Sequence, residues 1–247
     1  MSASTTAVAA RPHTAGDHGQ TDFDAIAAEY DDSLPHHVMD HYLEKRVDFI
    51  RRYVAPGSAV LDVGCGTGVL AKALAAKGYD VTGMDPFDGM LAYLRQRAPE
   101  ITAVQGRGEA IPFPDNTFDL AYCVAVMHHV ADPKDVHDTL KEMVRVTKPG
   151  GHILVWDHNP RNPYWPLLMK RVPQDTGAER LIPEREILDG LIAGGAWPMH
   201  VEALGLMPDF TPKPLVPLMT RVEAVVEHTP LVNRLCAHNV ILAVKGS

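Results

Sequence analysis

Short apolar runs of β-strand character alternate with longer runs of helical periodicity through the middle of the chain. Strands that alternate with helices predict parallel βαβ units, with right-handed crossovers and helices on both faces of one sheet. The first four runs lack a clean two-residue alternation, as expected for strands buried on both faces. The predicted strands are Ala59–Val63, Asp80–Asp85, Ile101–Gln105, Phe118–Val124 and His152–Asp157, and the predicted helices between them are Val69–Ala76, Gly89–Arg97 and Pro133–Val146. The pattern indicates an α/β fold with a doubly wound sheet.

The segments on either side of this alternation predict a helical cap over a single domain. A helical pattern occupies Phe23–Val54, and a proline-rich stretch follows the fifth strand. Beyond it the sequence predicts a helix at Glu184–Ala193, a strand at Met199–Leu206, an amphipathic segment at Leu215–Glu227 and a final strand at Asn239–Val244. We therefore expect a disordered leader at 1–21, a helical lid at 22–54, a ligand-binding core at 55–157, a cap with the sixth strand at 158–235 and a last strand at 236–247.

Composition excludes several classes of protein. With 46% hydrophobic and 22% charged residues, the 247-residue chain has a globular composition. Its 23 basic and 31 acidic residues give a net charge of −8, which argues against nucleic acid as a partner. Three widely spaced cysteines do not suggest a disulfide framework, and no apolar run approaches the roughly 20 residues of a membrane span. The sequence predicts a cytoplasmic protein without integral membrane contact, and it leaves the oligomeric state open.

A glycine-rich loop follows the first predicted strand. The run Val60–Gly68 places an acid, Asp62, before glycines at every second position, just ahead of a helix. Such glycines allow positive φ and a close approach of the backbone to a ligand. Backbone N–H groups at the helix start suit a polar or anionic group. The spacing matches neither the phosphate-binding P-loop nor the dinucleotide G-x-G-x-x-G fingerprint, which disfavours an NAD-dependent enzyme.

A second acid strengthens the interpretation of the loop. Asp85 ends the second predicted strand, about twenty residues further on, where a Rossmann-like fold places a carboxylate that accepts from ribose hydroxyls. The alternative is a tight turn followed by a helix cap at Asp85. Both features fall at the carboxyl ends of adjacent strands, where open α/β sheets bind ligands.

At this point the sequence resembles the class I S-adenosylmethionine-dependent methyltransferases, especially the ubiquinone/menaquinone-type group. The resemblance runs from Phe23 to Val155 through four segments: Phe23–Asp31, Leu61–Gly68, Gly108–Asp119 and Lys148–Gly151. It implies a Rossmann-like sheet of seven strands, mostly parallel with the last strand antiparallel, and S-adenosylmethionine as cofactor. The cofactor-binding residues that it implies are Tyr30, Asp62, Gly64, Cys65, Gly66, Gly68, Asp85, Pro86, Gly108, Glu109 and Val124.

One position departs from the family pattern. The family usually has an acid where this chain has Arg107, and that acid accepts a hydrogen bond from the adenine amino group. Arginine cannot accept a hydrogen bond. Either Glu109 makes the contact or the backbone around Gly108 reads the adenine alone.

Two adjacent histidines are the candidate bases. His128 and His129 follow the fourth predicted strand, and histidine has a pKa close to neutrality. Such a pair is common in the resembled group whatever the acceptor, so packing or pocket-lining roles stay open, above all for His129. The candidate acceptor-binding residues are His158 and Asn159, at the end of the fifth strand, and Tyr164 and Met219 in the apolar cap. No histidine spacing suggests a metal site.

The function expected from the sequence is biosynthetic methylation of a small, hydrophobic or aromatic molecule. Two alternatives keep the cofactor: an enzyme of non-methylating, cyclase-like chemistry, and a regulatory protein that binds the cofactor without turnover.

Overall fold

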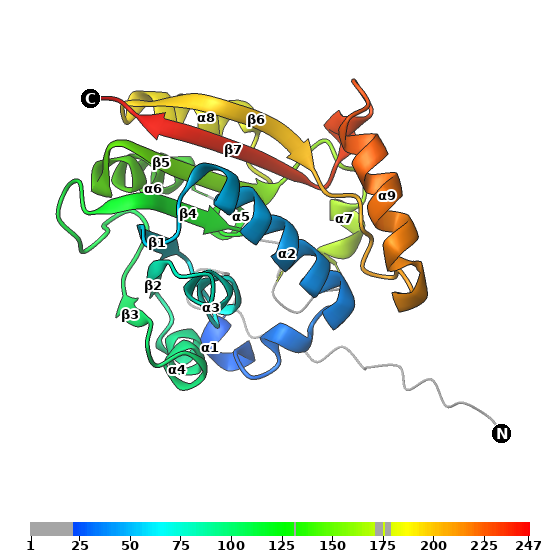
Figure 1. The fold of residues 1–247 in the computed structure, drawn as a ribbon, viewed down its shortest axis with the longest axis horizontal. Coiled ribbons are helices and arrows are strands. Elements are labelled where there is room, and N and C mark those ends of the chain that lie inside the picture. The colour runs from blue at the N-terminus through cyan, green and yellow to red at the C-terminus, as the bar shows by residue number, and fades with distance from the viewer. Residues whose placement is uncertain (1–21, 131, 171–174, 176–178) are drawn as a thin grey trace.

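The computed structural model describes residues 22–130, 132–170, 175 and 179–247. The predicted leader at 1–21 therefore lies outside the described residues, as do the last residues of the proline-rich stretch. Seven strands form one sheet in the order β3-β2-β1-β4-β5-β7-β6, with helices packed on both faces (Figure 1). The strands are β1 (Ala59–Val63), β2 (Asp80–Asp85), β3 (Thr102–Gln105), β4 (Phe118–Val124), β5 (Thr147–His158), β6 (Ala196–Leu204) and β7 (His238–Lys245).

The first five strands are parallel, and β7 is antiparallel to both β5 and β6. The Rossmann-like, doubly wound fold expected from the sequence is thus confirmed, including the antiparallel last strand. The strand order reverses between β1 and β4, and this switch point is where α/β sheets open a crevice at their carboxyl edge.

Each face of the sheet has its own apolar core. One core lies under α2 (His36–Tyr53), α3 (Val69–Ala75) and α4 (Asp88–Arg97), and the other under α6 (Pro133–Val146) and α8 (Glu184–Ala193). On α6 the buried residues recur every three or four positions, which is the spacing of one helical face. The short helices are α1 (Phe23–Ile26), α5 (Met127–Val130) and α7 (Trp165–Leu168), and α9 (Val216–Glu227) is the last helix longer than one turn.

Some predicted boundaries were wrong, each for a non-local reason. The sixth strand begins at Ala196 rather than Met199, because its pairing with β7 extends back to the Ala196–Lys245 pair. It ends at Leu204, because Gly205 adopts φ +87°. The fifth strand begins at Thr147, which pairs with Phe118 ahead of a bulge.

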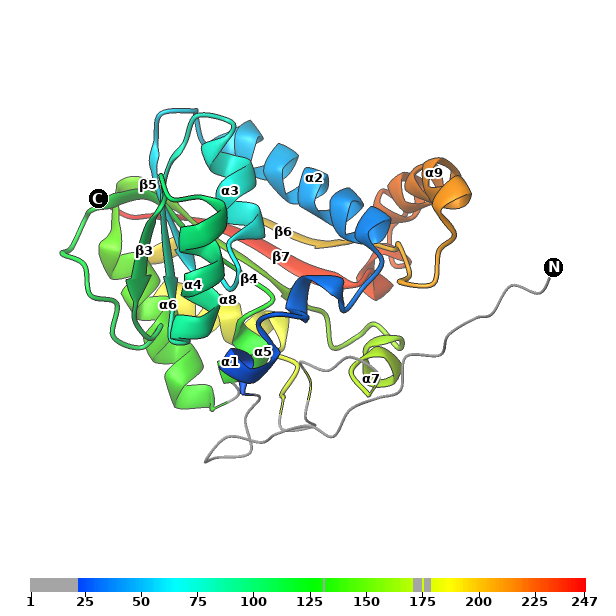
Figure 2. The same ribbon diagram turned by 90° about the horizontal axis from the view of Figure 1, so that it is seen from below.

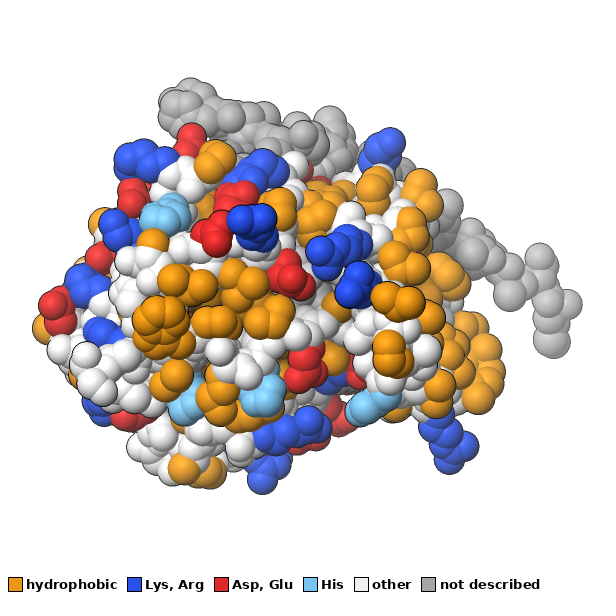
Figure 3. All heavy atoms as spheres, turned by 90° about the horizontal axis from the view of Figure 1, so that it is seen from above, with side chains coloured by type: hydrophobic (Ala, Val, Ile, Leu, Met, Phe, Trp, Pro, Cys, Tyr) orange, Lys and Arg blue, Asp and Glu red, His pale blue; other side chains and the backbone are white. Residues whose placement is uncertain are grey.

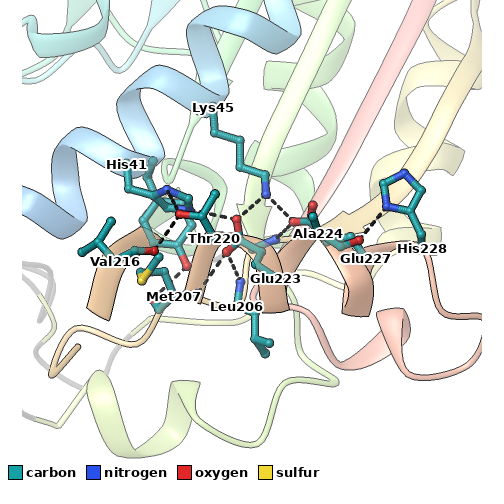
Figure 4. A network of polar contacts seen from close by, with 12 residues as sticks. His41, Lys45, Leu206, Met207, Val216, Thr220, Glu223, Ala224, Glu227 and His228 are labelled. Atoms are coloured by element: carbon teal, nitrogen blue, oxygen red, sulfur yellow. Dashed lines mark hydrogen bonds and ion pairs between the residues drawn. The ribbon is translucent and has the colours of Figure 1, made fainter. Parts of the chain in front are cut away.

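A buried polar network fastens α9 to α2 (Figure 4). The carboxylate of Glu223, 1% exposed, accepts from His41 Nε2 at 2.8 Å and from the Met207 backbone N at 3.0 Å, and it pairs with Lys45. Lys45 also pairs with Glu227. These partners hold the pKa of Glu223 at about 2, although burial alone would raise it. The network thus joins two helices from opposite ends of the chain.

Apolar side chains also gather on the outer surface, over the β6 edge and over α9 (Figure 3). The exposed ones include Trp197, Met199 and Val201 on β6, and Leu218, Val222 and Val225 on α9. None of these six side chains lines the two hollows described below.

No helix in the described part of the chain has the length and apolar content that a membrane crossing requires.

Candidate functional site

The loop after β1 opens a hollow at the switch point of the sheet. Gly64 and Gly66 have φ of +75° and +54°. A Cβ added at Gly66 would meet only the Tyr30 ring, at 4.0 Å, whereas one at Gly64 would lie 2.6 Å from a methyl of Val126. Glycine is therefore required at Gly64 by the fold, and at Gly66 it leaves open space beside the backbone.

Asp85 ties this loop to the end of β2. Its carboxylate accepts from the backbone N of Gly66 at 2.9 Å and from that of Phe87 at 3.0 Å. Burial raises the pKa of Asp85, against the lowering effect of these two hydrogen bonds. The acid predicted from the sequence thus lies at the rim of the hollow, beside the glycine loop.

A first hollow lies between the glycine loop, the end of β2 and the segment 106–109. Tyr30, Gly64, Gly66, Asp85, Pro86, Gly108 and Glu109, all predicted from the sequence, line it, together with Met84, Phe87, Val126 and Thr139. Arg107 also lines it and donates from Nε to Glu109 Oε1. One carboxylate oxygen of Glu109 therefore already accepts a hydrogen bond from Arg107.

A second hollow adjoins the first and reaches under α2 and α7. The two share Tyr30, Gly64, Gly66, Ala125 and His129. Figure 2 shows α1 beside α5 near this junction, where the rings of Phe23 and His129 meet at 5.0 Å. The predicted residues in its wall are Asp62, Cys65, Val124, His128, His158 and Tyr164, and the wall also contains Leu34, Tyr42, Arg46, Trp165, Leu168 and His238.

His128, in this wall, forms a buried pair with Asp157. His128 Nδ1 lies 2.7 Å from Asp157 Oδ1, and the two residues are 2% and 1% exposed. Burial alone would lower the pKa of His128, but the Asp157 carboxylate outweighs it and raises that pKa above the ordinary value. The same contacts lower the pKa of Asp157. With Nδ1 donating to Asp157, Nε2 is the ring nitrogen that can accept a proton.

The other site histidines are neutral aromatic surfaces. His158 stacks between His128, with ring centroids 4.0 Å apart, and Trp165, at 3.6 Å. Burial and the neighbouring His128 charge lower the pKa of His158, and that of His129, well below the ordinary range. The two rings therefore shape the hollow without carrying charge.

His128, Asp157 and His158 form a cluster whose side chains suit a hydrogen-bonded pair better than a metal ion. His128, Asp157 and His158 bring one potential ligand atom each within 4.8 Å of one another, as do His128, His129 and Asp175. The oxygens of Asp157, however, already accept from His128, from the Met127 backbone N and from the His158 backbone N. The rings of His128 and His158 are only 19° from parallel, so their in-plane lone pairs do not converge on one point.

Comparison with known proteins gives the same assignment as the fold. A family model described as a methyltransferase domain matches residues 61–155. A ubiquinone/menaquinone biosynthesis C-methyltransferase UbiE from Hahella chejuensis is 34% identical over 187 residues, which are 66% of this chain and 73% of that relative. The chain belongs to the class I S-adenosylmethionine-dependent methyltransferases.

Two further matches show how far the likeness extends. A demethylmenaquinone methyltransferase from Renibacterium salmoninarum is 35% identical over 160 residues, and the match spans 61% of this chain and 65% of the length of that relative. A solved structure from Thermotoga maritima, titled as an S-adenosylmethionine-dependent methyltransferase and possible histamine N-methyltransferase, has a TM-score of 0.66 over 90% of this chain and 97% of its own. At 20% identity that likeness shows the fold alone.

The residues of this chain fit the family's cofactor. Gly66 leaves space that a Cβ would fill, and the buried Asp85 carboxylate lies on the same rim. Asp62, 4% exposed, is the second-to-last residue of β1, beside the loop, and burial raises its pKa to about 7. The donor set therefore offers carboxylates for hydroxyl and ammonium groups, as S-adenosylmethionine requires.

Three predicted site residues lie outside both hollows. Gly68 packs its backbone against Leu94. Asn159 is buried and donates from its amide to the Arg234 and Cys236 carbonyls, so it holds the chain together ahead of β7. Met219 packs with an apolar cluster between α2 and α9.

The sequence interpretation did not place several residues of the second hollow in the site, among them Tyr42, Arg46, Trp165 and His238. Arg46 lies in the middle of a long amphipathic helix, and a basic residue on the apolar face of that helix could have indicated a site residue. Nothing in the sequence around the other three residues indicates that they line a hollow.

Proposed function

We propose that this methyltransferase transfers a methyl group from S-adenosylmethionine to a small, hydrophobic or aromatic acceptor. One observation carries the proposal: a hollow rimmed by the glycine loop and Asp85 opens directly into a second hollow that combines a His–Asp pair with aromatic walls. Quinone-related names among the relatives favour an acceptor of quinone-like chemistry.

Residues of the first hollow would hold the cofactor. The Asp85 carboxylate suits the ribose hydroxyls, and the glycine loop leaves room for the polar end of the molecule. Glu109 and the backbone near Gly108 suit the adenine. When bound, S-adenosylmethionine supplies a methyl group that its sulfonium already activates, so the protein has mainly to position the acceptor.

The second hollow would provide the acceptor site and a base. His128, in its neutral form, can take a proton at Nε2 from a hydroxyl or carbon acid, while Asp157 fixes the ring and stabilises the charge that forms. Trp165, Leu34 and Leu168 offer the apolar surface against which a hydrophobic acceptor packs.

A methyl-label screen tests the proposed activity. The purified protein is incubated with cofactor labelled in its methyl group and with a panel of small aromatic, quinone-like and aliphatic compounds, and products are read by mass. We expect the label in an aromatic or hydrophobic compound, with S-adenosylhomocysteine formed in equal amount. Conversion of a compound without gain of label would favour cyclase-like chemistry, and tight cofactor binding without turnover would favour a regulatory protein.

Replacing Asp85 with alanine should weaken cofactor binding. The loss of a charged acceptor for hydroxyl groups costs about 1.5–3 kcal/mol, or roughly ten- to a hundredfold in affinity. Calorimetric titration with S-adenosylhomocysteine measures the effect. Glu100→Ala, at an exposed site, is the matched control. An unchanged affinity in a folded Asp85→Ala protein would remove the ribose assignment.

Replacing Arg107 with alanine should have a small effect. Its guanidinium bonds to Glu109 and cannot accept from an adenine amino group, so we expect less than about a tenfold change in affinity for S-adenosylhomocysteine. A hundredfold loss in the same titration would show a direct contact between Arg107 and the cofactor.

A further inference from the structure

Helix α9 turns both of its acids inward and four apolar side chains outward. Glu223, the buried residue of this helix, and Glu227 pair with Lys45 on α2. The outward apolar residues, three or four positions apart, are Leu215, just before the helix, and Leu218, Val222 and Val225. A surface helix ordinarily does the reverse, because apolar side chains stabilise a fold when they are buried. The outer side of α9 is therefore suited to a contact outside the fold.

The apolar surface continues past the end of α9. Leu231, Val232 and Leu235 are all exposed, Leu231 to 70%. The backbone of Leu231 has φ +72°, in the left-handed region that strains residues other than glycine. A strained backbone that holds a leucine in solvent indicates a role for that side chain beyond the fold. Together with the outward residues of the helix, these side chains form the α9 face: Leu215, Leu218, Val222, Val225, Leu231, Val232 and Leu235.

The exposed charges around the α9 face are basic. Among residues 210–236 the exposed Lys, Arg, Asp and Glu side chains are Lys213, Arg221 and Arg234. No ion pair joins any of these three to an acid within the described residues. The acids of the segment, Glu223 and Glu227, are turned toward α2. The whole chain has a net charge of −8, so the positive charge on this face is a local feature.

The α9 face adjoins the second hollow. Tyr164 and Asp209 line that hollow, and the Tyr164 hydroxyl donates to the Asp209 carboxylate. Phe210, the next residue, is 68% exposed, and its ring lies 6.0 Å from that of Tyr164. From Phe210 the chain runs directly to Leu215, where the α9 face begins. A molecule that lies against this face is therefore beside the wall of the proposed acceptor site.

A lipid surface fits the α9 face better than a second copy of the chain or a protein partner. A two-fold contact through this face would bring the cations of both copies together, and like charges oppose such a contact. Protein interfaces concentrate aromatic side chains, whereas the seven residues of the α9 face are leucine and valine. Aliphatic side chains need no partner of matching shape when they enter fluid acyl chains, and flanking cations attract anionic headgroups. Figures 1 and 2 show α9 at one end of the molecule, with no other described helix or strand on its outer side.

We propose that the α9 face docks on an anionic phospholipid surface, with its leucines and valines among the acyl chains and Lys213, Arg221 and Arg234 at the headgroups. A helix held in this way lies in the interface and does not cross the bilayer. The docking goes beyond the proposed function. The further step, in which a hydrophobic acceptor reaches the second hollow from the lipid, rests on that function.

Vesicle sedimentation tests the docking. The full chain is mixed with vesicles of phosphatidylcholine alone or of phosphatidylcholine with an equal part of phosphatidylglycerol, and the bound fraction gives a partition coefficient. We expect at least about tenfold stronger binding to the anionic vesicles, and the difference should shrink at about 0.5 M salt. Wild type that stays in the supernatant with both kinds of vesicle, or that binds both equally, would overturn the proposal.

Paired variants locate the contact. Leu218→Ser combined with Val225→Ser should weaken binding to the anionic vesicles by at least about tenfold, and Arg221→Glu by about 5- to 30-fold. The controls are Trp197→Ser, at the exposed start of β6, and Lys77→Glu, an exposed site with the same change of charge. Both controls should stay within about twofold of wild type. Equal losses in the controls, or no loss in the α9 variants, would show that α9 is not the docking site.

Leu231→Gly separates docking from folding. Glycine accepts φ +72° without strain, so the free energy of unfolding should change little, while the partition coefficient for the anionic vesicles should fall about 3- to 10-fold. Lower stability with unaltered vesicle binding would assign Leu231 to the fold and contradict the proposal.

Sedimentation equilibrium without vesicles tests for a second copy. A dimer that becomes a monomer in Leu218→Ser with Val225→Ser, when neither protein binds vesicles, would show that a second copy covers the face, and the proposal would fail. These assays use neither cofactor nor acceptor. Methyl transfer can therefore fail in the label screen while docking holds, and docking can fail while transfer holds.

Discussion

Replacing His128 with alanine is expected to lower kcat by about 10²–10⁴, the range for loss of a general base, for an acceptor that must lose a proton. The affinity for S-adenosylhomocysteine should stay within about threefold of wild type, because the ring belongs to the second hollow. His129→Ala is the neighbouring control, and we expect it to cost less than about tenfold, because the ion pair of His129 within the described residues is with Glu179 at 4.0 Å, beyond hydrogen-bond distance. Rates are measured with the acceptor from the label screen.

The pH profile tests the same pair in a second way. The base must be neutral to act, and Asp157 raises the pKa of His128 above its ordinary value of about 6.5. The rate of the wild type should therefore fall as pH drops through that raised pKa, and stay level above it. In Asp157→Asn burial is no longer opposed, so the acid limb should move to lower pH. A profile that does not move, with a small effect of His128→Ala, would indicate an acceptor that is already ionised.

Replacing Glu223 with glutamine is expected to lower the free energy of unfolding by about 3 kcal/mol at pH 7, because the folded protein holds the pKa of this acid at about 2, against about 4.3 when unfolded. The substitution keeps the volume and removes the charge that pairs with Lys45 and His41. The measurement is urea unfolding followed by circular dichroism.

The sign of this contribution fixes its pH dependence. A lowered pKa stabilises the fold above the unfolded value, and the stabilisation is lost as pH falls through the folded value. The difference between wild type and Glu223→Gln should stay constant from pH 7 to pH 5 and shrink below about pH 4.3. Glu100→Gln, on the surface, should differ from wild type by less than about 0.5 kcal/mol. Equal stabilities of wild type and Glu223→Gln at pH 7 would show that the network in Figure 4 does not hold α9 in place.

The sequence predicts those features that depend on neighbours along the chain. The alternation of short apolar runs with helical runs located β1, β2 and β4, and the glycine loop with Asp85 follows from where those strands end. The position of His128 after β4 was enough to place it among the candidates. Each of these inferences needs only a local pattern and the rule that parallel strands end at one edge.

The parts that could not be predicted depend on how the flanking helices dock. Glu223 and His41 are 182 residues apart, and nothing near either residue in the sequence indicates the partner. Arg46 is one of several basic residues on α2, and only the packing of that helix against Trp156 shows that its guanidinium lies in the wall of the second hollow. Asn159 and Met219 were predicted to bind the acceptor. In the structure both lie outside the two hollows: Asn159 donates to the Cys236 carbonyl, and Met219 packs with the apolar cluster between α2 and α9.

The two hollows draw their lining from different segments of the chain, and this has one more consequence. The glycine loop, Asp85 and His128 all come from the continuous stretch that the family model matches, whereas Tyr42, Arg46, Trp165 and His238 come from segments before and after it. Substitutions in the flanks should therefore alter mainly the second hollow, because Phe23, Tyr30 and Glu179 are the residues of the first hollow's described lining that lie outside the matched stretch.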